Sequence, residues 1–210
     1  MKHDLIKRIL SSLILLPIAL FLIINGSILF NIFLTITLAI TLYEWHKMSK
    51  LKPYYFFGLI FISISFYTIY KFINFENNYI YFLIVTLICV STDIGGYIFG
   101  NIFKGPKITK ISPKKTYSGM IGGYIVSIIV LIVFLYPITI TFNILIFILL
   151  VSSVSQLGDL IISYFKRLSK IKDTGHIIPG HGGLLDRIDG MIFAFPFSYL
   201  ILKLKILQIL

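Results

Sequence analysis

The stretch from Ser163 to Asp189 brings together the residue types of this chain that could do chemistry. It reads SYFKRLSKIKDTGHIIPGHGGLLDRID and lies between strongly apolar runs. Charged residues beside sequence that is hydrophobic enough to span a membrane cost free energy, so such a segment indicates a function. Cations, carboxylates and glycines are the groups that contact phosphates and metal ions, so the segment predicts metal-assisted phosphate chemistry.

The rest of the chain predicts an all-α, polytopic integral membrane protein. Of its 210 residues, 58% are hydrophobic and 13% are charged, and the mean hydropathy is +0.96. Residues 9–43 and 116–158 contain no charge, and each run could supply two spans of about 20 residues. The single cysteine, Cys89, excludes a disulfide framework and a cysteine-based metal site.

We expect about seven transmembrane helices with the N-terminus in the cytoplasm. The polar stretch Glu44 to Tyr54 is expected to be a loop, with Trp45 at the membrane interface. The expected spans are 9–24, 28–43, 56–70, 79–100, 119–136, 139–160, with its helix running on to Arg167, and 184–202.

Counting cations supports this layout. The seven-span layout places 16 of the 19 lysines and arginines on one side of the membrane. The exceptions are Lys71, Lys203 and Lys205. By the positive-inside rule that side is the cytoplasm. We expect N-terminal transmembrane helices, residues 1–80, and a catalytic transmembrane region, residues 81–210, in the inner membrane with a site facing the cytoplasm. The net charge of +11 indicates loop cations beside anionic lipid, with no nucleic-acid partner.

Aspartates inside apolar helices, or at their cytoplasmic ends, are functional candidates because carboxylates are expensive there. Asp186 and Asp189 are three apart at the expected start of the last helix and would share a face. Asp159, Ser163 and Lys166 would share a face of the preceding helix. The candidates are Asp93, Asp159, Asp186 and Asp189.

If those two helices pack, Asp159, Asp186 and Asp189 converge beside Lys166. Oxygen ligands of this kind suit Mg²⁺, which takes one or two carboxylates together with phosphates and water. Zinc, which His176 and His181 could suggest, is disfavoured because the nearby ligand set lacks cysteine. A structural pairing of each aspartate with a lysine or arginine is the alternative.

The turn Pro179-Gly180-His181-Gly182-Gly183 precedes the last expected helix. Glycines permit close backbone approach, and N–H groups at a helix start favour anions. The alternative is an ordinary Pro-Gly loop. The position of the turn between a basic segment and an acidic one favours phosphate binding.

A second polar cluster comprises Asp93 and the basic loop from residue 104 to residue 118. Its hydrogen-bond donors would lie on the cytoplasmic side; they are Ser112, Lys114, Lys115 and Thr116. A loop that only sets topology would explain the lysines but not the order Ser-Pro-Lys-Lys-Thr.

The pattern from Ser163 to Asp189 resembles the signature of phosphatidate cytidylyltransferases, also called CDP-diacylglycerol synthases. Every position of that pattern is filled, and the segments around Asp93 and Ser112 are similar to the same family. The resemblance covers about residues 85–200. The matching positions are Ser163, Lys166, Arg167, Lys172, Asp173, Gly175, Pro179, His181, Gly182, Gly183, Asp186, Arg187 and Asp189.

The resemblance implies that CTP condenses with phosphatidate to give CDP-diacylglycerol and pyrophosphate. It implies Mg²⁺, with two cations of which the second is unidentified, and a homodimer embedded in membrane lipid. By resemblance Asp159, Asp186 and Asp189 hold the metal, and Lys166 joins them in the catalytic set. The substrate-binding set is Asp93, Ser112, Lys114, Lys115, Thr116, Arg167, Lys172, Asp173, His181, Gly182, Gly183 and Arg187.

Two features depart from the family. Where the family usually has an acidic residue after Lys-Thr-aromatic, this chain has Ser118, and its N-terminal side is short. Two other functions are disfavoured by the sequence. A CDP-alcohol phosphotransferase would need an aspartate spacing that this chain lacks. A transporter or channel with intramembrane aspartates would not need a Gly-His-Gly-Gly turn beside a basic cluster.

Overall fold

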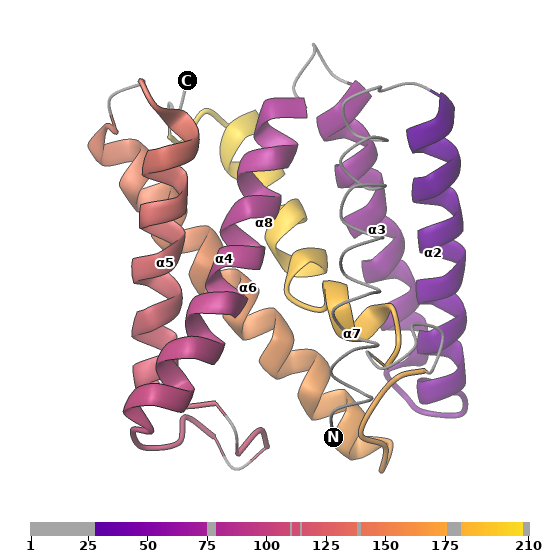
Figure 1. Cartoon of the computed structure of the whole chain (residues 1–210). Coiled ribbons are helices and arrows are strands. Elements are labelled where there is room, and N and C mark those ends of the chain that lie inside the picture. Colours follow the sequence, from indigo (N-terminus) through magenta and orange to yellow (C-terminus); the bar gives the residue numbers. More distant parts are fainter. Residues whose placement is uncertain are drawn as a thin grey trace. The chain divides into compact units, whose positions relative to one another are not determined.

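A computed structural model gives the fold of the chain and describes residues 28–74, 79–109, 111–113, 115–137, 140–175 and 182–207. Over these ranges the named elements are all helices, and isolated bridge residues occur at Lys107, which pairs with Thr116, and at Gly182. The helices, labelled as in Figure 1, are α2 (Ile28–Ser49), α3 (Tyr55–Asn74), α4 (Tyr79–Phe103), α5 (Tyr117–Leu135), α6 (Phe142–Leu168), α7 (Leu185–Ile188) and α8 (Met191–Lys203).

The expectation of an all-α, polytopic membrane protein is confirmed. In the described part of the chain, the five helices α2 to α6 are long and apolar enough to cross a membrane. They correspond to the second through sixth expected spans. Helix α6 continues to Leu168, which confirms the predicted extension beyond residue 160. The first expected span, 9–24, lies outside the described residues.

The expectation of one continuous helix over residues 184–202 is wrong. Helix α7 ends at Ile188, and α8 begins at Met191. Between them, the side-chain Oδ1 of Asp189 accepts a hydrogen bond from the N–H of Gly190 at 2.9 Å. Such a local bond offers the backbone an alternative to the helix. Asp186 and Asp189 therefore do not lie on one face of a continuous helix, and α8 has 13 residues, or about 20 Å.

The chain forms two compact units. The first, which we call the N-terminal unit, comprises Met1–Tyr79 and Lys166–Ile188. The second, which we call the core unit, comprises Ile80–Phe165 and Asp189–Leu210. Most of the polar segment that follows α6 thus belongs with the N-terminal helices. The assignment of catalysis to residues 81–210 stays a prediction.

In the N-terminal unit, α2 and α3 lie side by side as an antiparallel pair (Figure 1). The indole of Trp45 is 2% exposed, and its Nε1 donates to the carbonyl of Tyr55 at 3.0 Å. A Cβ at Gly58 would collide with this ring. The expected loop from Glu44 is therefore wrong over residues 44–49, which stay helical. Trp45 fills the space between the two helices, and its position at a membrane interface stays a prediction.

In the core unit, small residues bring α4 and α5 close together. A Cβ on Gly95 would lie 2.9 Å from the carbonyl carbon of Gly122. Close backbone approach through glycines is typical of membrane helices, as are hydroxyl bonds between them. One such bond joins α4 to α6, from the hydroxyl of Thr92 to that of Ser152 at 2.8 Å.

Helix α8 packs in the core unit through its aromatic residues. The ring of Phe195 stacks on Phe82 of α4 with centroids 5.1 Å apart. Gly190 approaches α6 so closely that a Cβ there would lie 2.9 Å from the carbonyl oxygen of Ser155. These contacts fix the turn that carries Asp189 against α6.

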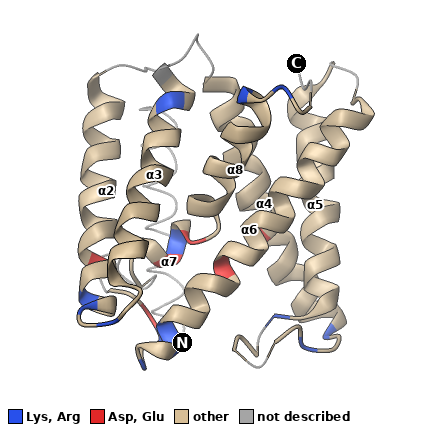
Figure 2. Ribbon diagram, turned by 180° about the vertical axis from the view of Figure 1, so that it is seen from behind, with Lys and Arg blue, Asp and Glu red and all other residues tan. Residues whose placement is uncertain are grey.

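Most basic residues gather at one end of each unit (Figure 2), and Arg187 lies on α7. In the N-terminal unit they lie around the α2–α3 turn and the end of α6, and Lys71 lies in the last turn of α3 at the other end. In the core unit they lie on the loop that joins α4 to α5, with Lys203 at the far end of α8. This separation agrees with the sequence-based count of cations. The orientation of these ends in the membrane stays a prediction.

Candidate active site

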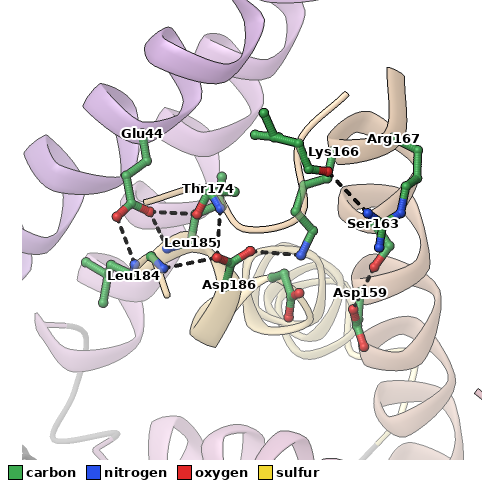
Figure 3. Close-up of polar contacts among 12 residues, drawn as sticks. Glu44, Asp159, Ser163, Lys166, Arg167, Thr174, Leu184, Leu185 and Asp186 are labelled. Carbon is green, nitrogen blue, oxygen red and sulfur yellow. Dashed lines mark hydrogen bonds and ion pairs between the residues drawn. The ribbon is translucent and has the colours of Figure 1, made fainter. Parts of the chain in front are cut away.

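Asp186 is a buried carboxylate of the signature segment that accepts three hydrogen bonds. It lies on α7, and its side chain is 7% exposed. Its Oδ1 accepts a hydrogen bond from the ammonium of Lys166 at 2.8 Å. Its Oδ2 accepts the N–H groups of Thr174 at 2.8 Å and Gly183 at 3.0 Å (Figure 3). The lysine at the end of α6 and the loop that follows it are thus joined at one carboxylate.

These contacts keep Asp186 ionised. Burial raises the pKa of its carboxyl, but the effect is outweighed by the hydrogen bond and charge of Lys166 and by the two backbone N–H groups. The net result is a pKa below the ordinary value for aspartate. The site therefore presents a carboxylate at neutral pH.

The end of α6 fixes the direction of Lys166 and of the chain that follows. Lys170 adopts a left-handed conformation with φ of 57°. The N–H of Ile171 bonds to the carbonyl of Lys166 at 3.0 Å, and that of Lys170 to the carbonyl of Arg167 at 3.0 Å. This pair of bonds is the Schellman motif that ends helices. It turns the chain so that Thr174 reaches Asp186.

Glu44 is a buried residue of this site that sequence reasoning missed. It lies on α2 and is 1% exposed. Its Oε1 accepts the N–H of Leu184 at 2.9 Å, and its Oε2 accepts the N–H of Leu185 at 2.8 Å. Oε2 also accepts the hydroxyl of Thr174 at 3.0 Å. The signal in the sequence is a carboxylate directly after the uncharged run of residues 9–43, at a position where the sequence predicts the start of a loop.

The glycines before α7 fit the close packing of this turn. Gly182 has φ of 83°, a left-handed conformation that favours glycine. A Cβ on Gly183 would lie 2.6 Å from Oε2 of Glu44 and 2.8 Å from the backbone nitrogen of Gly175. At least one function of Gly183 is therefore to let the backbone approach the protein's own carboxylate. Phosphate binding by this turn stays a prediction.

The core unit contains a cavity of about 470 Å³. Lys115 and Asp159 form an ion pair in its wall, with side chains 24% and 29% exposed. The hydroxyl of Ser163 donates to the other oxygen of Asp159 at 3.3 Å, as expected for residues on one face of α6. The lining is mostly apolar, but it includes four predicted site residues: Asp93, Lys115, Thr116 and Asp159.

The loop between α4 and α5 holds Lys115 in place through backbone bonds. The N–H of Lys115 donates to the carbonyl of Ser112 at 3.0 Å, and its carbonyl accepts from Ile108 at 2.9 Å. Thr116 then caps α5, because its hydroxyl accepts the N–H of Gly119 at 3.1 Å. Ser118 contacts the hydroxyl of Thr116 at 3.0 Å, so here this residue helps to close the loop.

The structure distributes the predicted site residues between the two units. Lys166, Asp186 and the glycines of the turn meet in the N-terminal unit, whereas Asp159 and Asp189 belong to the core unit. The convergence of Asp159, Asp186 and Asp189 therefore stays a prediction. Ser112 supports Lys115 through its backbone. Exposed side chains are those of Asp93, Arg167, Lys172, Asp173 and Arg187. Lys114, His176 and His181 lie outside the described residues.

The donors present suit a magnesium ion in chemical type. Asp159 combines an intermediate exposure with a place on the cavity wall, so its oxygens can reach a ligand there. Mg²⁺ needs few protein oxygens when phosphates and water complete its shell. Within each unit, the described residues contain no group of three acidic, histidine or cysteine side chains close enough to hold a metal. Substrate oxygens would have to supply the remaining ligands.

Known proteins resemble this chain over most of its length. A phosphatidate cytidylyltransferase of Rickettsia felis is 37% identical, covering 95% of this chain and 93% of the relative. The phosphatidate cytidylyltransferase of Rickettsia prowazekii is 36% identical, covering 95% of this chain and 92% of the relative. The phosphatidate cytidylyltransferase of Staphylococcus haemolyticus is 44% identical, covering 58% of this chain and 48% of the relative.

A sequence model of the cytidylyltransferase family matches residues 54–205, which include α3 to α8 and the whole signature segment. The apolar helices and the bacterial relatives together indicate a multi-pass protein of the inner membrane. Because the family model matches more than two thirds of the length of this chain, the chain belongs to the cytidylyltransferase family.

Proposed function

We propose that the chain transfers a cytidylyl group from CTP to phosphatidate, giving CDP-diacylglycerol and pyrophosphate for phospholipid synthesis. The observation that carries the proposal is the family match over residues 54–205, which contains the signature from Ser163 to Asp189. The relatives named as phosphatidate cytidylyltransferases support the choice of substrates.

In the reaction, a phosphate oxygen of phosphatidate attacks the α-phosphorus of CTP. The bond from that phosphorus to the bridging oxygen of the β-phosphate breaks, and pyrophosphate leaves with the bonding electrons. Phosphatidate arrives ionised at neutral pH, so the step needs no general base. The work of the protein is to bring two polyanions together and to stabilise the charge that develops.

The cavity of the core unit suits the lipid substrate. Its mostly apolar wall can hold the glycerol end of a lipid, and Lys115 places a cation in that wall. A phosphate entering the cavity would compete with Asp159 for Lys115. Because the ion pair is partly exposed, exchanging one anion for another costs little. Lys115 and Thr116 are therefore the proposed phosphate contacts.

In the N-terminal unit, Lys166 and Asp186 supply the charged part of the proposed site. Bound Mg²⁺ would neutralise phosphate charge and orient the reacting groups. Asp159, Asp186 and Asp189 are the residues proposed to hold it and a second cation. Lys166 keeps Asp186 ionised and oriented by its 2.8 Å bond. The site is proposed to face the cytoplasm, where CTP is available, and the enzyme is proposed to act as a homodimer.

The proposal is tested with protein purified in detergent. Radiolabelled CTP and phosphatidate should give labelled CDP-diacylglycerol when Mg²⁺ is present, and a chelator should stop the reaction until Mg²⁺ is restored. Asp159→Asn should abolish turnover, whereas Lys107→Met, on an exposed lysine of the α4–α5 loop, should not. Folded wild-type protein that makes no product with lipid and metal varied would refute the proposal.

A further inference from the structure

We propose that Glu44 is a positioning residue for catalysis: from helix α2, it holds the backbone turn that carries Asp186. This inference rests on the proposed function and deepens it. It gives α2, whose Glu44 precedes the start of the signature segment at Ser163 by 119 positions, a direct part in forming the active site.

Thr174 links the two carboxylates. Its N–H donates to Oδ2 of Asp186 at 2.8 Å, and its hydroxyl donates to Oε2 of Glu44 at 3.0 Å. Both bonds come from one residue of the loop after α6. A shift of Glu44 therefore moves a donor of Asp186 (Figure 3).

The turn before α7 is divided between the same two carboxylates. The N–H of Gly183 bonds to Asp186 at 3.0 Å. The next two N–H groups, of Leu184 and Leu185, bond to Glu44 at 2.9 and 2.8 Å. Three consecutive N–H groups that would otherwise be unpaired at this helix start are thus satisfied by side chains. Glu44 fixes the two residues that directly precede Asp186.

The carboxylate of Glu44 is committed to this turn. It is 1% exposed, and among the described residues its partners are three hydrogen-bond donors and no cation. Burying a carboxylate is costly unless its bonds are satisfied, and bonds to a charged acceptor are strong. Glu44 is therefore buried because its carboxylate accepts the hydrogen bonds of this turn, and not because of general packing of α2.

The turn also lies directly against Glu44. Added Cβ atoms on Gly175 and Gly183 would each lie 2.6 Å from an oxygen of its carboxylate. No side chain fits at either position without displacing Glu44. Because misplacing a catalytic group by about 1 Å can reduce the rate about 100-fold, loosening this turn should reduce turnover through Asp186.

The test compares Glu44→Gln with Thr41→Val. Thr41 is one turn earlier on α2 and is 0% exposed, but among the described residues its hydroxyl bonds only to the carbonyl of Thr37. Turnover per folded molecule should fall about 100-fold in Glu44→Gln and stay within about threefold in Thr41→Val. Hydrogen exchange at Leu184 and Leu185, measured without substrates, should be about tenfold faster in Glu44→Gln alone.

A second variant decides the matter if Glu44→Gln does not fold. Thr174→Val removes the hydroxyl bond to Glu44 and keeps the N–H bond to Asp186. It should lower turnover about tenfold. Where Glu44→Gln does fold, adding Thr174→Val to it should cause little further loss, because the hydroxyl bond that Thr174→Val removes is one of the three bonds of Glu44 that are already weakened.

Each outcome has a definite meaning. If the amides of Leu184 and Leu185 exchange hydrogen in Glu44→Gln at the same rate as in wild type, the role assigned to Glu44 is overturned. A loss of activity explained wholly by less folded protein overturns it too, because a merely structural residue changes the folded fraction and not turnover per molecule. If the wild-type amides of Leu184 and Leu185 are protected from hydrogen exchange but the folded protein transfers no cytidylyl group, the proposed function is overturned instead.

Discussion

Glu44 and Thr174 are 130 positions apart in the sequence, and the hydroxyl of one meets the carboxylate of the other at 3.0 Å. The bond joins α2 to the loop after α6 within the N-terminal unit. The loop is tied in turn to Asp186 through the N–H of Thr174. The signature segment therefore takes its shape from a helix outside its own sequence.

Removing the cation beside Asp186 should destabilise the protein. Lys166→Met leaves the carboxylate buried without its ion pair, so the free energy of unfolding should fall by about 3 kcal/mol. Activity should be lost as well. Thermal unfolding in detergent measures the first effect, and CDP-diacylglycerol formation the second. Lys50→Met, at an exposed position after α2, is the control and should change neither. Equal stability of the two variants would contradict the prediction.

The stability of the protein should depend on pH through Asp186. The folded protein holds the pKa of this carboxyl below its ordinary value of about 3.9. Its contribution is therefore complete above that value and is lost as the pH falls through the lower folded pKa. Below about pH 4, the free energy of unfolding should fall more steeply in wild type than in Asp186→Asn. Parallel curves for the two proteins would refute this.

The ion pair between Lys115 and Asp159 should matter for activity and little for stability. Both side chains are about a quarter exposed, so the pair contributes at most about 1 kcal/mol. Lys115→Met should leave thermal unfolding nearly unchanged and reduce turnover about 100-fold, because a cation on the proposed phosphate path is lost. Lys107→Met, on the same loop, is the matched control. A large drop in stability with normal turnover would show a structural role instead.

Two neighbouring glycines of α4 should respond differently to alanine. A Cβ on Gly95 would lie 2.9 Å from Val126 and from the backbone of Gly122, whereas on Gly96 its nearest neighbour would be 3.6 Å away. Gly95→Ala should therefore lower the free energy of unfolding by about 2 kcal/mol through overpacking. Gly96→Ala should be neutral or slightly stabilising, since alanine favours helix. Thermal unfolding separates them, and identical midpoints would show that α4 and α5 can move apart.

Much of the fold could be predicted because its causes are local. Long uncharged runs such as residues 116–158 are hydrophobic in any arrangement, and their length alone indicates membrane helices. The face shared by Asp159 and Ser163 also follows from helical spacing, and the 3.3 Å bond confirms it. The break at Asp189 was missed because it depends on a side-chain bond to Gly190 and on the contact of that glycine with α6.

By itself, the sequence determined that this is a multi-pass membrane protein and that its polar segment has the residues of a cytidylyltransferase. The first conclusion needs only composition and periodicity, whereas the second comes from the resemblance of the residue order to a known family signature. Tertiary structure alone decided that Glu44 is a buried acceptor and that Trp45 packs against Gly58. A carboxylate at the end of an apolar run can be solvated or bonded, and nothing nearby in the sequence distinguishes the two. Only folding brings the N–H groups of Leu184 and Leu185 to it.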